Sequence, residues 1–278
     1  MNKSVISGNI FLSLLLLICS AIPARSVAQE SWKSTAWQLG PGSTYLYDDY
    51  ISPISYTAHS LRLSLEFFKP IGHNEEGILH SDPDIWFNQF SMHLLPAVTK
   101  TQSGHWLFHA QAEIQNTTFR QVAGDVYWYL RAGGFLALRG GGRLTYQSSN
   151  NPGSADIMTD IGAAVMAGYR FQLWGKNLHL RYLGNFPLAG LAFSPEYTQS
   201  YYEIFYLGNY EKTMKFTSLH NKKQWMQQLS LDIPLSRKQS SLRLSYWNEG
   251  RITKMNNLNI RVISDQFSIG YIRYFKVL

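Results

Sequence analysis

The sequence predicts an all-β fold, a single antiparallel transmembrane β-barrel that follows a cleaved signal peptide. Three observations predict it: a short apolar leader, strands that alternate with period two up to the last residues, and an unusual composition. Charged residues are only 15% of the chain, whereas aromatic residues are 14%, with 17 Tyr and 8 Trp. Soluble domains usually carry about 25% charged residues, and membrane barrels concentrate aromatic side chains at both bilayer interfaces.

Residues 1–28 have the features of a signal peptide. Lys3 gives a positive n-region, and residues 10–18 (IFLSLLLLI) form an apolar stretch too short to span a bilayer as a helix. Small residues in Ser26-Val27-Ala28 predict cleavage before Gln29. A lipoprotein signal using Cys19 is the less favoured alternative, because Ile18 stands where a small residue is needed. Since Cys19 is the only cysteine, the mature chain is expected to have no disulfide and no thiolate chemistry.

The mature chain has no later run of about 18 apolar residues, which excludes an ordinary helical membrane protein. The net charge is +7, and removing Lys3 and Arg25, the only charged residues of the leader, leaves +5. This excess is scattered rather than clustered, so no nucleic-acid partner is expected. Export and barrel class together predict the outer membrane of a Gram-negative bacterium.

Residues 29–60 are expected to be an irregular segment before the barrel, because Gly40-Pro41-Gly42 and Ser52-Pro53 interrupt any regular element. The barrel is then expected over residues 61–278. Its first strand alternates Leu61, Leu63, Leu65 and Phe67 with Arg62, Ser64 and Glu66, and residues 106–115 alternate in the same way. Further strands are expected at 86–98, 127–146, 157–174, 178–186, 201–207, 212–219, 224–233, 240–252, 257–263 and from 266 onward. Since single-chain bacterial barrels favour even numbers, we expect about 12 strands, with 10 as the runner-up.

The last thirteen residues, 266–278, predict how the barrel closes. Phe267, Ile269, Tyr271 and Phe275 share one face, so this strand should turn apolar side chains to lipid and pair with the first strand. Arg273 shares that face. An arginine facing lipid costs roughly 0–1 kcal/mol near an interface against ~2–4 kcal/mol at the midplane. Arg273 is therefore expected at the periplasmic headgroup level.

Inward-facing charges are expected to fill the lumen rather than to form a catalytic centre. Buried charges need partners, and a narrow barrel supplies them across its interior. The residues expected to form this plug of ion pairs are Arg62, Glu66, Glu113, Arg131, Arg139 and Arg143.

The histidines do not predict a metal site. His105 and His109 would lie about 13 Å apart on one strand face, too far to share one ion. The acidic segment 72–84 matches no calcium-loop spacing. We therefore expect no catalytic, metal or cofactor site. A weak candidate pair, Ser218 and His220, would share a strand face about 7 Å apart, without an acid that can be named.

One block is not explained by periodicity: residues 193–210, which contain Phe193-Ser194-Pro195-Glu196-Tyr197 and Tyr201-Tyr202-Glu203. With residues 46–53 (LYDDYISP), 217–221 (TSLHN) and 256–258 (NNL), it resembles an uncharacterised family of Bacteroidetes outer-membrane β-barrel proteins, a domain of unknown function. The resemblance implies an exported barrel and brings no catalytic residues.

Within that block, Pro195 would disrupt a central strand, and the tyrosines suit an interface. We expect a loop that folds inward and plugs the lumen; the alternative is contact with a partner or glycan. The candidate residues are Pro195, Glu196, Tyr197, Tyr201 and Tyr202.

The function predicted from these features is non-enzymatic: a structural or accessory role in the envelope, as an assembly or secretion partner. A barrel of this size has an interior largely filled by side chains, which argues against a wide pore. The alternatives are a narrow channel or small-ligand transporter, and a membrane-embedded lipid hydrolase. Expected partners are outer-membrane lipid and lipopolysaccharide, the barrel-assembly machinery through the C-terminal strand, and an envelope protein.

Overall fold

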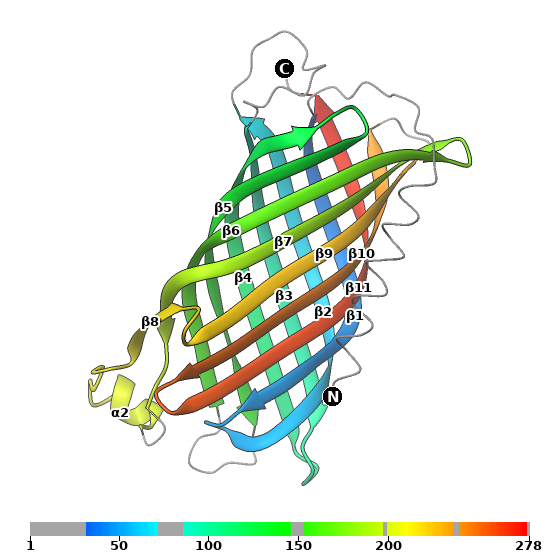
Figure 1. Ribbon diagram of the computed structural model, residues 1–278. Helices are drawn as coiled ribbons and strands as arrows, with labels where there is room; N and C mark the ends of the chain where they lie inside the picture. Colours follow the sequence, from blue (N-terminus) through cyan, green and yellow to red (C-terminus); the bar gives the residue numbers. More distant parts are fainter. Residues whose placement is uncertain (1–31, 72–85, 146–152, 197–198, 236–238, 277–278) are drawn as a thin grey trace, which may run out of the picture.

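The computed structural model describes residues 32–71, 86–145, 153–196, 199–235 and 239–276, and in them it shows a closed antiparallel β-barrel (Figure 1). The expected signal peptide, residues 1–28, lies outside the described residues. The elements are β1 (Trp32–Asp48), β2 (Ser52–Ile71), β3 (Trp86–Lys100), β4 (Trp106–Gly124), β5 (Trp128–Thr145), β6 (Gly153–Leu173), β7 (Lys176–Phe193), α2 (Tyr201–Phe205), β8 (Met214–Ser218), β9 (Lys222–Pro234), β10 (Ser240–Met255) and β11 (Leu258–Lys276).

The predicted fold class is confirmed. Each strand of the circuit pairs with its neighbours in sequence, except that β7 pairs with β9 and that β1 pairs with β11 to close the barrel. Among the described residues, ten strands form the circuit, which is the runner-up count, and the short β8 adds an eleventh beside β7. Because Trp32 lies opposite Lys276, both described ends of the chain meet at one end of the barrel. We name it the terminus end, and the opposite end, where α2 lies, the α2 end (Figure 1).

The barrel is polar inside and apolar outside, the reverse of a soluble protein. On β2, Leu61 and Phe67 are 39% and 42% exposed, whereas Arg62 and Glu66 are 1% and 3% exposed. Soluble proteins rarely bury Arg and Glu, and they rarely expose large continuous areas of apolar side chains. Alternation of apolar-out and polar-in is the pattern of a membrane barrel. No described helix has the length and apolar character needed to cross a bilayer.

The expectation of an irregular segment over 29–60 is wrong for its described part. Residues 32–48 form β1 and residues 52–60 begin β2. Pro41 has no N–H to donate, and pairing with β11 is interrupted only there: Leu39 lies opposite Ile269 and Gly42 opposite Gln266 in one register. Gly42 allows the close approach of β11, since a Cβ there would lie 2.1 Å from the Asp265 carbonyl oxygen.

Three other expected strands are also corrected. Residues 201–205 form the helix α2, because Ser200 and Glu203 make a reciprocal capping box. The segments 257–263 and 266–278 were expected to be separate strands, but residues 258–276 are the single strand β11. A tight turn precedes it: Asn256 and Asn257 both have positive φ, 49° and 61°, which the right-handed twist of a two-residue hairpin favours.

The expected face of the last strand is confirmed. Phe267, Ile269, Tyr271 and Phe275 are all exposed on the outside of the barrel, and Arg273 is exposed with them. The Arg273 guanidinium carbon lies 5.2 Å from the centre of the Phe275 ring. The level of Arg273 relative to the headgroups stays a prediction.

Candidate functional site

Buried ion pairs fill the lumen at three levels, and the first lies at the α2 end. Arg143 Nε lies 2.7 Å from Asp48 Oδ2, and Arg143 Nη2 lies 2.6 Å from Asp156 Oδ2. Arg251 Nη2 approaches the same Asp156 oxygen at 2.5 Å, and Ser154 donates to Asp48. All five side chains are buried. Two guanidiniums therefore face two carboxylates, and the charges balance.

The second level is in the middle of the lumen. Arg62 Nη2 lies 2.6 Å from Glu249 Oε2, and the Arg62 guanidinium lies over the ring of Trp247. Arg139 pairs with Glu113. The pair of Lys222 and Asp160 adds a further bridge.

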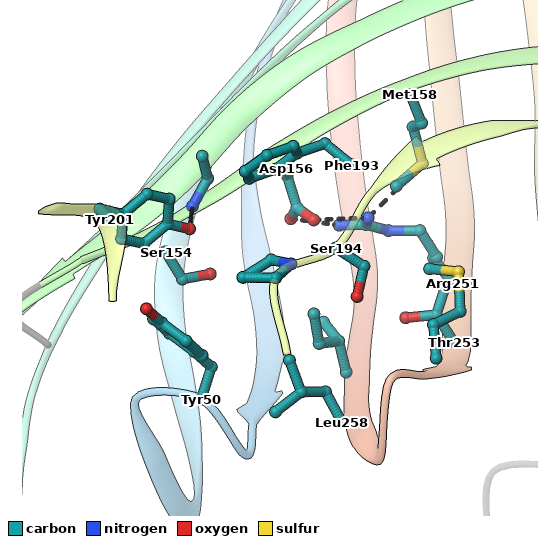
Figure 2. Close-up of a pocket in the computed structure, with 14 residues that line it drawn as sticks. Tyr50, Ser154, Asp156, Met158, Phe193, Ser194, Tyr201, Arg251, Thr253 and Leu258 are labelled. Carbon is teal, nitrogen blue, oxygen red and sulfur yellow. Dashed lines mark hydrogen bonds and ion pairs between the residues drawn. The ribbon is translucent and has the colours of Figure 1, made fainter. Parts of the chain in front are cut away.

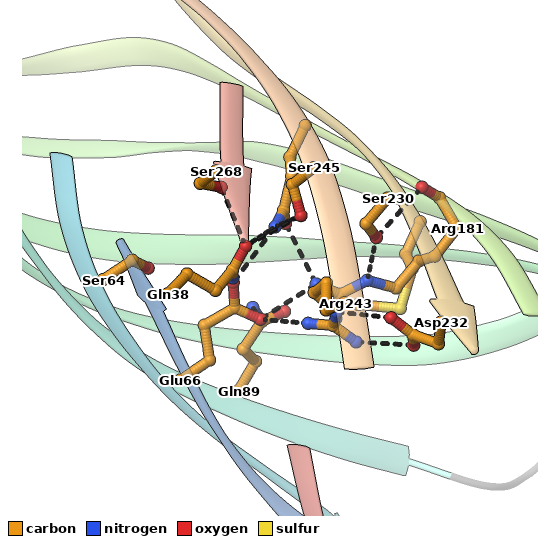
Figure 3. Close-up of polar contacts among 12 residues, drawn as sticks. Gln38, Ser64, Glu66, Gln89, Arg181, Ser230, Asp232, Arg243, Ser245 and Ser268 are labelled. Carbon is orange, nitrogen blue, oxygen red and sulfur yellow. Dashed lines mark hydrogen bonds and ion pairs between the residues drawn. The ribbon is translucent and has the colours of Figure 1, made fainter. Parts of the chain in front are cut away.

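The third level lies toward the terminus end and is centred on Glu66 (Figure 3). Glu66 Oε2 accepts from Arg181 at 2.9 Å and from Arg243 at 3.1 Å. Arg243 also donates two hydrogen bonds to Asp232, at 2.6 and 2.8 Å. Gln38 donates to the other Glu66 oxygen. The expected plug of ion pairs is thus confirmed for Arg62, Glu66, Glu113, Arg139 and Arg143, but Arg131 pairs with no carboxylate of the described residues.

The connection from β7 to β8 crosses the barrel mouth at the α2 end. Tyr50, in the turn between β1 and β2, donates from its hydroxyl to the Gln199 carbonyl at 2.9 Å. On the opposite wall, the backbone amide of Ala155 on β6 donates to the Tyr201 hydroxyl at 2.5 Å (Figure 2). Asn256 donates to the Ser194 carbonyl at 2.6 Å. We call residues 194–196 and 199–205 the mouth segment.

A small hollow, partly open to solvent, lies between the mouth segment and the first level of ion pairs. Figure 2 shows Asp156 and Arg251 on one side of it and Tyr50 and Tyr201 on the other. Burial, and next the neighbouring Tyr201, raise the pKa of Tyr50 to about 12. Burial also raises the pKa of Tyr201. Both phenols are therefore neutral hydrogen-bonding groups at neutral pH.

The expected loop residues divide between two surfaces. Pro195 is buried and lines the hollow with Tyr201, and Glu196 is half-buried. Tyr202 points outward instead and stacks on Tyr206, which is 74% exposed. Tyr197 lies outside the described residues. We call the exposed side chains of this region the α2 aromatic patch: Tyr202, Phe205, Tyr206, Leu207 and Tyr210.

The candidate pair Ser218 and His220 is closer than expected. Ser218 ends β8 and His220 lies in the turn that follows, so the two do not share a strand face. Their Oγ and Nδ1 atoms lie 2.6 Å apart. Among the described residues, no carboxylate is bonded to His220, and no three His, Cys, Asp or Glu side chains gather as a metal site. The pair supplies two of the three groups of a hydrolytic triad.

A hydrogen-bonded relay at the terminus end was missed from the sequence. Tyr129 Oη lies 3.1 Å from His179 Nε2, and His179 Nδ1 lies 3.5 Å from Asp232 Oδ2. Gly168 makes room for it, because a Cβ there would lie 2.2 Å from Tyr129 Cζ. The three groups come from β5, β7 and β9, so the only sequence signal is that each faces inward. Which inward residues meet across a lumen is not visible in period-two alternation.

The chain matches one family model and is similar to several solved structures. A family model described as "Protein of unknown function (DUF3316)" matches residues 10–278. No curated protein matches the chain. The chain is similar to the outer membrane protease OmpT from Escherichia coli, with 6% identity, TM-score 0.44, 91% of this chain and 99% of that chain covered.

Two autotransporter structures are similar in the same way. The beta domain of the Bordetella autotransporter BrkA has 10% identity and TM-score 0.42, with 88% of this chain and 100% of that chain covered. The transport unit of AIDA-I from Escherichia coli has 8% identity and TM-score 0.41, with 95% and 97% covered. At these identities and TM-scores, the likeness assigns neither activity nor ligand to this chain.

Proposed function

Since the chain belongs to the family described as protein of unknown function, DUF3316, we propose its function from the barrel itself: a sealed outer-membrane protein with a structural or accessory role in the envelope. The proposed role is non-enzymatic.

The outer-membrane location is supported by the inverted distribution of side chains. A chain that spans lipid must satisfy every backbone polar group internally, which a closed barrel achieves. Large apolar side chains are exposed on the outside of the strands; examples are Leu63, Phe108, Leu138 and Ile161. Their natural surroundings are outer-membrane lipid and lipopolysaccharide. We propose that the chain reaches this membrane after signal-peptide cleavage and through the barrel-assembly machinery.

The main support for a sealed lumen is the contact between Glu66 on β2 and Arg181 on β7. These strands are five positions apart in a circuit of ten described strands, so they are opposite walls, and their side chains meet at 2.9 Å. The middle and α2-end levels add further bridges, and the mouth segment covers one end. Such packing leaves little space for the passage of a hydrated ion.

Planar-bilayer recordings test this seal. The purified wild-type barrel should stay silent over a range of voltages. Its matched comparison is a variant that lacks two of the described middle-level ion pairs, R62A/E113A/R139A/E249A, which should conduct in steps if its folding is confirmed by heat-modifiable gel mobility. Steady conductance of the wild type would instead favour the narrow channel.

The accessory role is supported by the α2 aromatic patch. Tyr and Phe side chains gathered on an exposed surface are typical of protein contact sites. Gentle detergent extraction should copurify one stoichiometric envelope protein with the wild type and lose it with F205S/Y206S. Trp174→Ser, at an exposed turn of the terminus end, is the control and should keep the partner. Retention of the partner by the double variant would exclude this surface.

The hydrogen bond between Ser218 and His220 supports a second candidate, a lipid hydrolase at the α2 end. Lipid mass spectrometry of cells that overexpress the protein should then show a change which Ser218→Ala abolishes. Identical lipid profiles for the two strains would leave the non-enzymatic role as the better description.

A further inference from the structure

Arg131 is a buried cation that has no carboxylate partner among the described residues. It lies on β5 with 8% of its surface exposed, and no acid of the described residues forms an ion pair with it. Its Nε atom has no hydrogen-bond partner in the described structure. Buried charges in proteins are normally paired, because an isolated one loses its hydration without compensation. The terminus end therefore contains a buried positive charge without a carboxylate partner among the described residues, whereas the buried arginines of the three levels described above are paired.

Aromatic rings surround the Arg131 guanidinium. Its carbon lies 3.6 Å from the ring centre of Phe87, 4.0 Å from that of Tyr129 and 5.4 Å from that of Phe68. Cation–π contacts of this kind stabilise the guanidinium and fix its orientation. They leave its positive charge uncancelled.

A second cation faces the same mouth. The Arg170 guanidinium lies 5.7 Å from the Tyr129 ring, and its Nη1 donates to the Val126 carbonyl at 3.1 Å. Asp125, in the turn between β4 and β5, uses one oxygen to accept from the amides of Tyr127 and Trp128. Deeper in the lumen, two guanidiniums face the carboxylates Glu66 and Asp232, so that level is balanced. Among the described residues, the mouth therefore keeps a positive excess.

Neutral polar groups stand beside these cations. Tyr129 and His179 are hydrogen-bonded to each other, and the His179 side chain exposes 24% of its surface, so this part of the lumen is reachable from the mouth. The guanidinium N–H groups suit a ligand with several acceptor oxygens.

We infer that the terminus end of the barrel binds an oxyanion, a phosphate or carboxylate group of a small molecule or a lipid headgroup, through Arg131 and Arg170. The described part of the α2 end offers no equivalent, because Arg143 and Arg251 there already face Asp48 and Asp156. This inference is independent of the sealed lumen and of any protein partner.

Titration calorimetry with inorganic phosphate at low ionic strength tests the site on the folded wild-type barrel in a zwitterionic detergent. Saturable binding to one site is expected, at least tenfold weaker for Arg131→Gln. Arg273→Gln is the matched control, since it removes the same charge from an exposed position near the same end, and its affinity should equal that of the wild type. Absence of saturable binding, or equal weakening by both variants, would overturn the inference.

Two further titrations identify the source of the oxyanion. Acetate separates carboxylate from phosphate, and a soluble short-chain phosphatidic acid separates a lipid headgroup from a free anion. If the lipid binds over tenfold more tightly than phosphate and loses this with Arg131→Gln, the ligand is a headgroup. If it does not, while phosphate or acetate binds and depends on Arg131, the ligand is a free anion.

The chain also carries four acids between β2 and β3: Glu75, Glu76, Asp82 and Asp84. If the wild type bound neither phosphate nor acetate but the E75Q/E76Q/D82N/D84N variant bound one of them, the inference would be overturned. The chain itself would then supply the oxyanion.

Discussion

The two ends of the lumen handle buried arginines in different ways. At the α2 end, Arg143 and Arg251 share Asp156, and the mouth segment covers them. At the terminus end, Arg131 lies among aromatic rings without a carboxylate of the described residues. Balanced pairs give a closed, neutral structure, whereas a cation held by rings keeps its charge available. The same barrel therefore has one end built for closure and one end suited to a ligand.

The largest expected effect comes from removing a shared carboxylate at the α2 end. Asp156→Asn leaves Arg143 and Arg251 short of a buried partner, which should lower the free energy of unfolding by about 3–5 kcal/mol. Urea titration in detergent, followed by tryptophan fluorescence, measures it.

The matched change at the terminus end is Arg131→Gln, which orphans no carboxylate of the described residues. Its free energy of unfolding should stay within about 1.5 kcal/mol of the wild type, the scale of a few lost ring contacts. Equal losses for Asp156→Asn and Arg131→Gln would remove the distinction between the two ends.

The next effect concerns the packing of the relay. Gly168→Ala places a Cβ 2.2 Å from Tyr129 Cζ, so Tyr129 must leave His179. We expect a loss of about 1–3 kcal/mol in unfolding free energy, as for other overpacked sites. Gly140→Ala is the control, because its Cβ would meet nothing within 4 Å, and it should be within about 0.5 kcal/mol of the wild type. If Gly168→Ala left the free energy of unfolding unchanged, the Tyr129 ring would not be held against Gly168.

The strand faces could be predicted from the sequence, whereas the site could not. Arg62 and Glu66 were expected inside because period two assigns faces regardless of partners. β1 was missed because Pro41 predicts a break, although only its pairing with β11 is interrupted. The helix α2 did have a signal, Ser200 followed three residues later by Glu203, in a stretch rich in aromatics that favour strands. Contacts such as that between Tyr129 and His179 depend on barrel circumference and register, which no local pattern contains.

A smaller effect should come from the mouth segment. Tyr201→Phe removes the acceptor of the Ala155 amide, which should cost about 0.5–1.5 kcal/mol and speed hydrogen exchange of that amide. Tyr202→Phe, on the exposed face of α2, removes a hydroxyl in open surroundings and should leave exchange unchanged. Equal exchange in both variants would mean that the α2 end is not closed by this contact.

The smallest effect is expected at the outer surface of the terminus end. Arg273→Leu replaces an exposed charge that lies over Phe275, and at headgroup level the change should be about 0–1 kcal/mol in unfolding free energy. Ile269→Arg, four residues deeper on the same face of the strand, should cost more, up to about 2–4 kcal/mol at the midplane. If Arg273→Leu instead stabilised the barrel by about 2–4 kcal/mol, Arg273 would face acyl chains. The terminus end would then lie deeper in the membrane than the cations inside it, Arg131 and Arg170, allow.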